Sequence, residues 1–183
     1  MEPNGARSEP RRRTAIEAEL HRLEESATYS SQMQFEQAKL WRGVNLGLGL
    51  PASTLAAVSG ATALASTAGR LAAGVLALAA AGFGAVLTTV NSSHRMNQSA
   101  SAANAYLEIQ TAARQAREID LPVLSIEEAR GVLAELTARR DEQNKTAEPP
   151  GRRAYRRAKA NITGGGQDYA VDAAIAEDGS ARS

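Results

Sequence analysis

The sequence predicts an all-α membrane protein: a two-span transmembrane helical hairpin with long cytoplasmic helices on both sides. Between Gly43 and Ser93 the chain runs 51 residues with one ionisable side chain, Arg70. A soluble helical domain spreads its charges more evenly, because the water-facing side of each helix needs them. The two uncharged stretches, 43–69 and 71–93, each exceed the about 20 residues that a helix needs to cross the hydrocarbon core of a bilayer.

A buried, Ala-rich helical hairpin of a soluble protein is the competing interpretation, since Ala and Gly are frequent in the uncharged segment. Such a hairpin needs apolar partners to cover it. The flanking segments are too polar to do so, because they hold all the other Lys, Arg, Asp and Glu side chains. The pattern therefore favours the membrane.

Ahead of the uncharged segment, residues 1–13 are polar and are expected to be disordered, without an apolar signal peptide. Residues 14–42 are predicted to form one amphipathic cytoplasmic helix, since Thr14 and Glu17 match a capping box. Apolar residues at spacings of four, three and four then form a narrow, coiled-coil-like stripe. The stripe consists of Ile16, Leu20, Leu23 and Ala27.

The uncharged segment divides into a first span at 43–66, an external turn at 67–70 and a second span at 71–93. Arg70 is expected at the tip of this hairpin. Each Leu, Val or Phe favours insertion by only about 0.3–0.6 kcal/mol, so the two spans are expected to enter the bilayer together. Pro51 lies inside the first span and predicts a kink there.

Basic residues near the span ends predict the orientation, because cytoplasmic loops carry an excess of Lys and Arg. Lys39, Arg42 and Arg95 flank the two spans, whereas the turn offers only Arg70. Both termini are therefore expected in the cytoplasm, with the protein a multi-pass component of the inner (plasma) membrane. The residues expected at the membrane interface are Trp41, Arg42, His94 and Arg95.

Small residues recur through both spans, and small residues let helices approach closely in lipid. Ser53, Ala57 and Ala61 form one ladder, and a second contains Ala77, Ala81 and Ala85. Their density predicts homo-oligomers, although single matches arise by chance in an Ala-rich chain. The expected packing or pore positions are Gly47, Pro51, Ser53, Gly74, Gly82 and Gly84. Span Ser, Thr and Asn side chains either line a wet path or bond to their own helices.

Residues 94–143 are predicted to form further cytoplasmic helices. The seam continues after the second span in Ala103, Tyr106, Ile109, Ala113 and Ala116, and Leu121-Pro122 then breaks the chain. Ser125 and Glu128 match a second capping box. The apolar face of the helix that follows is predicted to contain Ile126, Ala129, Val132, Leu133 and Leu136. These thin stripes are expected to pack on one another or on neighbouring subunits.

Residues 144–183 resemble a partly disordered tail with a basic run around Tyr155. The run consists of Arg152, Arg153, Arg156, Arg157 and Lys159. A solvated helix face, a contact with anionic lipid and a phosphate-bearing ligand or nucleic acid all fit this composition. Nucleic acid is the least favoured, because the formal net charge of the chain is only +1.

Chemistry-bearing patterns are sparse. The chain contains no cysteine, which excludes a disulfide framework and a thiolate metal site. His21 and His94 lie on different predicted helices, and no nucleophile elbow or metal-ligand spacing occurs. We therefore expect no catalytic residue, no cofactor and no metal. We also expect that the protein is not an enzyme.

The layout resembles the SLATT family over about residues 14–172. The matching features are Lys39-Leu40-Trp41-Arg42 before the hairpin, then Asn91, His94 and Arg95 leading into Ala103, Tyr106 and Leu107, and finally Tyr155, Ala158-Lys159 and Ile162. The resemblance implies a two-TM effector of bacterial conflict systems, associated with nucleotide-producing SMODS synthases or nucleotide-sensing SLOG domains, that opens pores in an infected cell. It also implies a nucleotide second messenger or sensor protein acting in trans, and no catalytic residues.

The function expected from the sequence is thus an anti-phage membrane effector that oligomerises in the lipid bilayer and forms a pore or lesion. A non-conducting membrane scaffold that recruits a cytoplasmic partner is the first alternative. A holin-like lysis protein is the second, although its cytoplasmic region is usually shorter than the one expected here.

Overall fold

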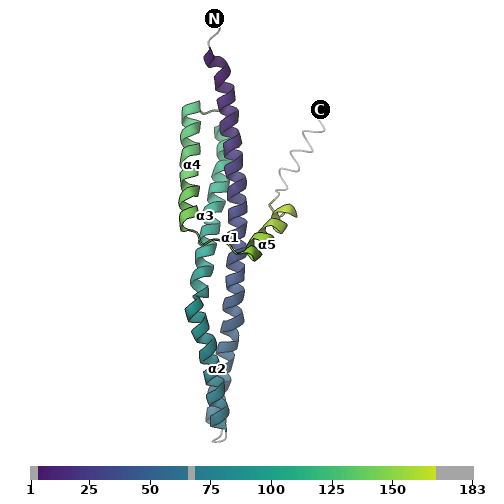
Figure 1. Ribbon diagram of the computed structural model, residues 1–183, viewed down its shortest axis with the longest axis vertical. Helices are drawn as coiled ribbons and strands as arrows, with labels where there is room; N and C mark the ends of the chain where they lie inside the picture. The colour runs from purple at the N-terminus through teal and green to yellow at the C-terminus, as the bar shows by residue number, and fades with distance from the viewer. Residues whose placement is uncertain (1–3, 66–68, 168–183) are drawn as a thin grey trace.

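The computed structural model describes residues 4–65 and 69–167. Over this part the chain is all-helical and elongated, with one helix running along most of its length (Figure 1). The other helices lie alongside it, and the two ends of α1 lie at opposite ends of the described structure. The predicted all-α class is therefore confirmed for the described residues.

The first helix, α1, extends from Asn4 to Ala65 without interruption. The helix predicted at 14–42 and the described part of the span predicted at 43–66, residues 43–65, belong to this one helix, which begins before Thr14. The capping box predicted at Thr14 does not form, because its hydroxyl instead donates to the carbonyl of Pro10, one turn earlier, at 3.1 Å. Residues 1–3 and 66–68 lie outside the described residues.

Pro51 does not end α1, although proline has no N–H for a helical hydrogen bond. The hydroxyl of Ser53 donates to the carbonyls of Gly49 and Leu50 at 2.9 and 3.0 Å. Thr54 also donates to Leu50, at 2.8 Å. Two hydroxyl groups thus add hydrogen bonds to carbonyls in the turn that contains the proline.

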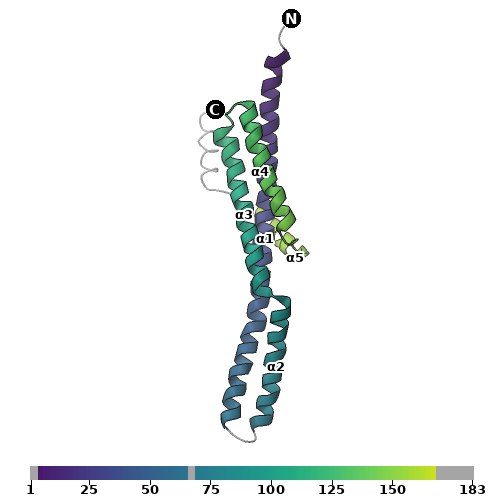
Figure 2. The same ribbon diagram turned by 90° about the vertical axis from the view of Figure 1, so that its left-hand side faces the viewer.

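The second helix, α2, spans Gly69–Val90 and runs back beside the C-terminal part of α1 (Figure 2). Arg70 is exposed in its first turn, next to the undescribed connection. After α2, Asn91 adopts a left-handed conformation with φ 51° and ψ 45°, which asparagine tolerates better than most residues. This residue separates α2 from α3, Ser92–Gln115, near the end of the uncharged segment.

A short π-helix, η1 (Ala116–Asp120), continues α3. The break predicted at Leu121-Pro122 is confirmed, since helical structure resumes only at Ile126. The guanidinium of Arg13 donates to the carbonyls of Leu121 and, at 2.9 Å, Leu124. The connection is thereby fastened to α1.

The predicted capping box at Ser125 is present at the start of α4, Ile126–Thr146. The Glu128 carboxylate accepts hydrogen bonds from the Ser125 backbone N–H at 2.9 Å and from its hydroxyl at 2.7 Å. The Glu128 backbone N–H in turn donates to the Ser125 hydroxyl at 3.3 Å. These hydrogen bonds, the side-chain one foremost, lower the pKa of Glu128, because they favour its charged form.

Replacing Ser125 with Ala is expected to raise the pKa of Glu128 back toward its ordinary value and to destabilise α4 by about 1 kcal/mol. A carboxylate whose folded pKa is lowered stabilises the fold above its unfolded pKa, and this stabilisation is lost as the pH falls through the folded pKa. Carboxyl NMR titration of Glu128 in both proteins measures the shift. An unchanged pKa in S125A would contradict the assigned cause.

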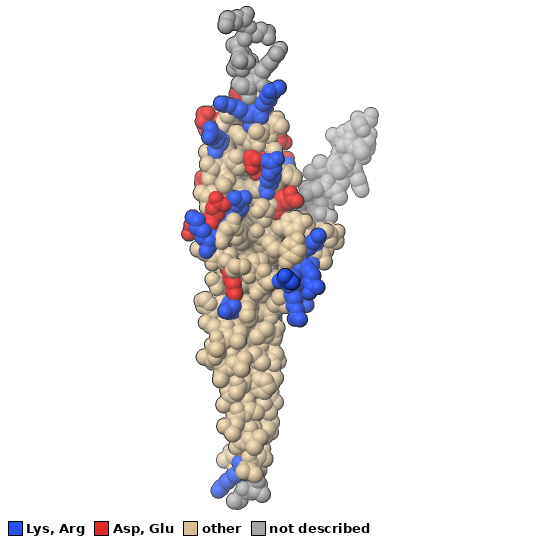
Figure 3. Space-filling model, in the orientation of Figure 1, with Lys and Arg blue, Asp and Glu red and all other residues tan. Residues whose placement is uncertain are grey.

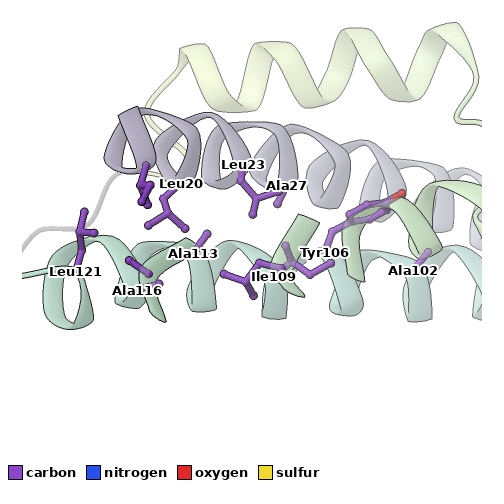
Figure 4. Packing of buried hydrophobic residues seen from close by; sticks show 12 residues of the cluster. Leu20, Leu23, Ala27, Ala102, Tyr106, Ile109, Ala113, Ala116 and Leu121 are labelled. Carbon is purple, nitrogen blue, oxygen red and sulfur yellow. The ribbon is translucent and has the colours of Figure 1, made fainter. Parts of the chain in front are cut away.

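The hydrophobic core of the charged half lies where α1, α3 and α4 meet (Figure 4). Residues of both predicted seams are buried in it, including Leu20 and Ile109, each 1% exposed. Ala129 and Leu136 of α4 complete the cluster, with Ile126, Val132 and Leu133 partly buried against it. The predicted packing of these stripes on one another is therefore confirmed.

Polar contacts connect the same three helices. The Tyr106 hydroxyl on α3 donates to Asn144 Oδ1 on α4 at 2.8 Å, and burial raises the pKa of Tyr106, with nearby Arg140 acting in the opposite direction. Arg117 forms an ion pair at 3.0 Å with Glu24 of α1. The last described helix, α5 (Arg152–Thr163), leaves this bundle and packs against α1 near its middle.

Candidate functional site

The uncharged part of α1 and all of α2 form the most unusual surface of the molecule. Both helices are long and apolar enough to cross a membrane, and only 6% of the most apolar stretch of each is buried. Leu64 and Leu71 are 90% and 84% exposed. Figure 3 shows this half almost without charged side chains, whereas positive and negative residues mix in the other half. The low burial is unlike the covered core helix of a soluble protein.

The two apolar helices contact each other through one stripe each. On both helices the more buried residues recur at alternating steps of three and four, as in a coiled-coil seam. On α1 this stripe contains Asn45, Leu48, Ala52, Leu55, Ser59 and Thr62. On α2 it contains Ala73, Leu76, Ala80, Phe83, Leu87 and Val90.

Hydrogen bonds between side chains and neighbouring helices stabilise the α1–α2 pair near both of its ends. The buried hydroxyl of Ser59 donates to the Ala73 carbonyl on α2 at 2.7 Å. At the other end, the hydroxyls of Ser92 and Ser93 donate to Asn45 Oδ1 at 3.0 and 3.2 Å. Hydrogen bonds of this kind satisfy groups that are costly to leave unpaired in an apolar environment.

The predicted small-residue positions lie away from the seam. Both ladders, 53–57–61 and 77–81–85, are exposed, as are Gly47, Gly74 and Gly82. A Cβ built on Gly47, Gly74, Gly82 or Gly84 meets nothing within 4 Å; Gly49 is the span glycine with a neighbour, a Leu87 methyl at 3.7 Å. These ladder and glycine positions therefore do not form the α1–α2 seam, whose small residues are instead Ala52, Ser59, Ala73 and Ala80.

The span hydroxyls mostly bond to their own helices. Besides Ser53 and Thr54, the side chains of Thr62, Thr88 and Thr89 donate to carbonyls four residues earlier, at 2.8–2.9 Å. The sequence left open whether these side chains line a wet path or bond to their own helices. In the single chain they bond to their own helices. This arrangement costs little in an apolar medium.

At the boundary between the two halves, the structure brings together two of the four predicted interface residues. The Arg95 guanidinium lies 5.0 Å from the Trp41 ring centroid, a cation–π contact. Arg95 also forms an ion pair at 2.6 Å with Glu148, which follows α4. Arg42 and His94 lie at the same level and are exposed.

The connection from α4 to α5 is hydrogen-bonded to α1 close to this boundary, a contact that no pattern in the sequence indicated. Gln34 Nε2 donates to the Glu148 carbonyl at 2.8 Å, and the Gly151 N–H donates to Gln37 Oε1 at 3.2 Å. Both glutamines are buried. Their side chains are neutral and lie outside the apolar stripe, so the sequence carried no signal for this role beyond Pro149-Pro150 as the end of α4.

The predicted basic cluster lies on α5. Ala154 and Ala158 are fully buried, and Asn161 donates to Gln32 Oε1 at 3.0 Å. Arg157 lies 4.0 Å from Glu36 of α1. The other basic residues, Arg152, Arg153, Arg156 and Lys159, are exposed. Residues 168–183 of the predicted tail lie outside the described residues.

Comparisons with models of known protein families, with curated proteins and with solved structures find no match for this chain. Within residues 4–65 and 69–167, no group of three His, Cys, Asp or Glu side chains is placed to hold a metal ion. The candidate site is therefore the pair of apolar helices, α1 and α2, in which Arg70 is the one charged residue among those described between Gly43 and Ser93. It includes the boundary where this pair joins the charged bundle.

Proposed function

We propose that this chain is a two-span membrane effector of a bacterial conflict system, which oligomerises and forms a pore or lesion in the inner membrane. The observation that carries the proposal is the exposure of the apolar side chains on α1 and α2, with Leu78 76% and Val75 64% exposed. In water this surface would be costly, at about 25 cal/mol per Å². In a bilayer the same side chains contact lipid tails, and this cost does not arise.

The proposal includes a transmembrane hairpin with both termini in the cytoplasm. The boundary at Trp41 and Arg95 marks the cytoplasmic interface, where aromatic and basic side chains are favoured. From Gly43 to Ala65 a helix rises about 33 Å at 1.5 Å per residue, enough to cross the about 30 Å hydrocarbon core. Arg70 then reaches the opposite headgroup region.

Oligomers are proposed because the glycine positions and both small ladders face outward in the single chain. Lipid tails fill such a surface less closely than another helix does, so small residues favour helix association. A nucleotide second messenger or a sensor protein is proposed to act in trans through the cytoplasmic bundle. The similarity to the SLATT family motivates this part of the proposal.

A non-conducting scaffold is the second candidate function. It is favoured by the span hydroxyls, which bond to their own helices and leave the pair without an evident polar path. In that case the bundle of α1, α3 and α4 would recruit a cytoplasmic partner while the spans only anchor it.

Induction in a bacterial host, with a voltage-sensitive dye and membrane fractionation, tests the proposal. A pore-forming effector is expected to depolarise the membrane before envelope integrity is lost, either when expressed alone or when co-expressed with a nucleotide synthase. A protein that stays in the membrane and leaves the potential intact under both conditions favours the scaffold. Recovery in the soluble fraction contradicts both.

The orientation can be tested with single cysteines, because the chain has none of its own. In intact spheroplasts, a membrane-impermeant maleimide is expected to label R70C, at the tip, and not Q98C on α3. Both positions are exposed in the chain, so the difference reports the side of the membrane. The reverse pattern would place the termini outside.

A further inference from the structure

We propose that α5 is an interfacial helix that binds the anionic headgroups of the bilayer face from which the two spans enter. The inference rests on the proposed membrane insertion and adds a ligand for the basic cluster. It assigns lipid, rather than solvent or nucleic acid, to the exposed face of α5.

The first observation is the charge of α5. Its twelve residues include five basic side chains and no acidic one. Arg157 approaches Glu36, whereas Arg152, Arg153, Arg156 and Lys159 have no carboxylate within 4.0 Å among the described residues. Elsewhere the charged half mixes both signs, and in Figure 3 a group of blue side chains stands by itself at the foot of α5.

The second observation is the direction of this charge. The fully buried Ala154 and Ala158 define the face of α5 that packs on α1. At 100° per residue, Arg152, Arg156 and Arg153 fall on the opposite face. The unpaired charges therefore point away from the protein.

The third observation is position. The near end of α5, Gly151, bonds to Gln37, which precedes Gly43 by about 9 Å along α1. The far end, Asn161, bonds to Gln32, about 17 Å from Gly43. Headgroups extend about 5–8 Å beyond the hydrocarbon, and charges act over about 10 Å at moderate salt. The N-terminal half of α5 thus lies within reach of an anionic surface.

The fourth observation is that α5 is held in place. Contacts at Gln34, Gln37 and Gln32 join it and the preceding connection to α1. A helix that is already positioned loses little conformational entropy when it binds. Each basic residue near an anionic surface then strengthens association about fivefold.

The test uses the full-length protein carrying Y155C, labelled with an environment-sensitive fluorophore; Tyr155 is 50% exposed. The labelled protein is reconstituted in phosphatidylcholine vesicles with and without phosphatidylglycerol, and a headgroup-attached spin label serves as quencher. We expect stronger quenching in the anionic vesicles, reduced to the zwitterionic level at about 1 M salt, where the screening length falls to about 3 Å.

The variant R152Q/R153Q/R156Q/K159Q is expected to show the same quenching in both vesicle types. R11Q/R12Q/R130Q/R139Q removes four exposed charges far from the boundary and is expected to behave as the unsubstituted protein. Equal quenching of the unsubstituted protein in both lipids would overturn the inference. So would an oligonucleotide that changes the fluorescence when phosphatidylglycerol does not.

Flotation of the vesicles distinguishes a failure of the proposed membrane function from a failure of the proposed lipid-binding role of α5. A protein that does not float with vesicles, or that alkaline carbonate removes from them, contradicts the proposed membrane function. A protein that floats and resists carbonate, with α5 insensitive to anionic lipid, contradicts only the role of α5.

Discussion

Replacing Gly74, Gly82 and Gly84 together with Leu is expected to abolish oligomerisation and lethality, restoring colony formation on induction to that of an empty vector. A Cβ built on any of these three glycines meets nothing within 4 Å in the single chain. The pairing of α1 with α2 is therefore expected to persist, while a neighbouring subunit is held farther away. Insertion should not suffer, since each Leu favours it by about 0.3–0.6 kcal/mol.

Crosslinking in membranes, together with viable counts, measures both effects. The matched control is A72L/A79L, which adds apolar volume at exposed positions of α2 outside the glycine and ladder sets. It is expected to retain oligomers and lethality. If the glycine triple variant crosslinks and kills like the unsubstituted protein, close packing through this face of α2 is not the basis of assembly.

Leu20→Ala is expected to destabilise the bundle of α1, α3 and α4 by about 2–5 kcal/mol. Leu20 is 1% exposed and lies in the cluster formed by α1, α3 and α4. Truncation removes apolar contacts and leaves a cavity that the surrounding helices fill only in part. The spans lie outside this cluster, so L20A should remain in the membrane while its bundle unfolds at lower temperature.

Thermal unfolding in detergent, followed by helical circular dichroism, tests this expectation. V123A is the control, because Val123 is 83% exposed in the connection before α4 and a surface substitution changes stability by less than about 0.5 kcal/mol. Equal midpoints for L20A and V123A would mean that the bundle does not depend on this cluster. Loss of lethality in L20A alone would link the bundle to activity.

Local patterns predicted most of the helices and the face that each buries. The steps from Ile16 to Ala27 and from Tyr106 to Ala116 match the core of α1, α3 and α4, because helix periodicity is a property of the backbone. The cap at Ser125 formed because its partner, Glu128, lies one turn away. The cap at Thr14 did not, because α1 had already begun and the hydroxyl had a carbonyl one turn earlier to bond.

The candidate site was predicted less completely. The small-residue positions named from the sequence were predicted for packing or a pore between subunits; in the single chain both ladders face outward, and the α1–α2 seam uses residues such as Leu48, Leu76 and Phe83. Periodicity identifies a stripe but not which of two stripes meets the neighbouring helix. The left-handed turn at Asn91 was also missed, since it lies within a continuous uncharged run.

The sequence by itself determined that this protein has two parts, a nearly uncharged segment and amphipathic flanks. Charge and helix periodicity are properties of neighbouring residues, so they can be read from the sequence alone. Only the tertiary structure decided which contacts hold the boundary together and where α5 lies. The contacts that hold them join residues 114 and 129 positions apart, such as Gln34 to Glu148 and Gln32 to Asn161. Such contacts depend on where packed helices bring their side chains, which no local pattern contains.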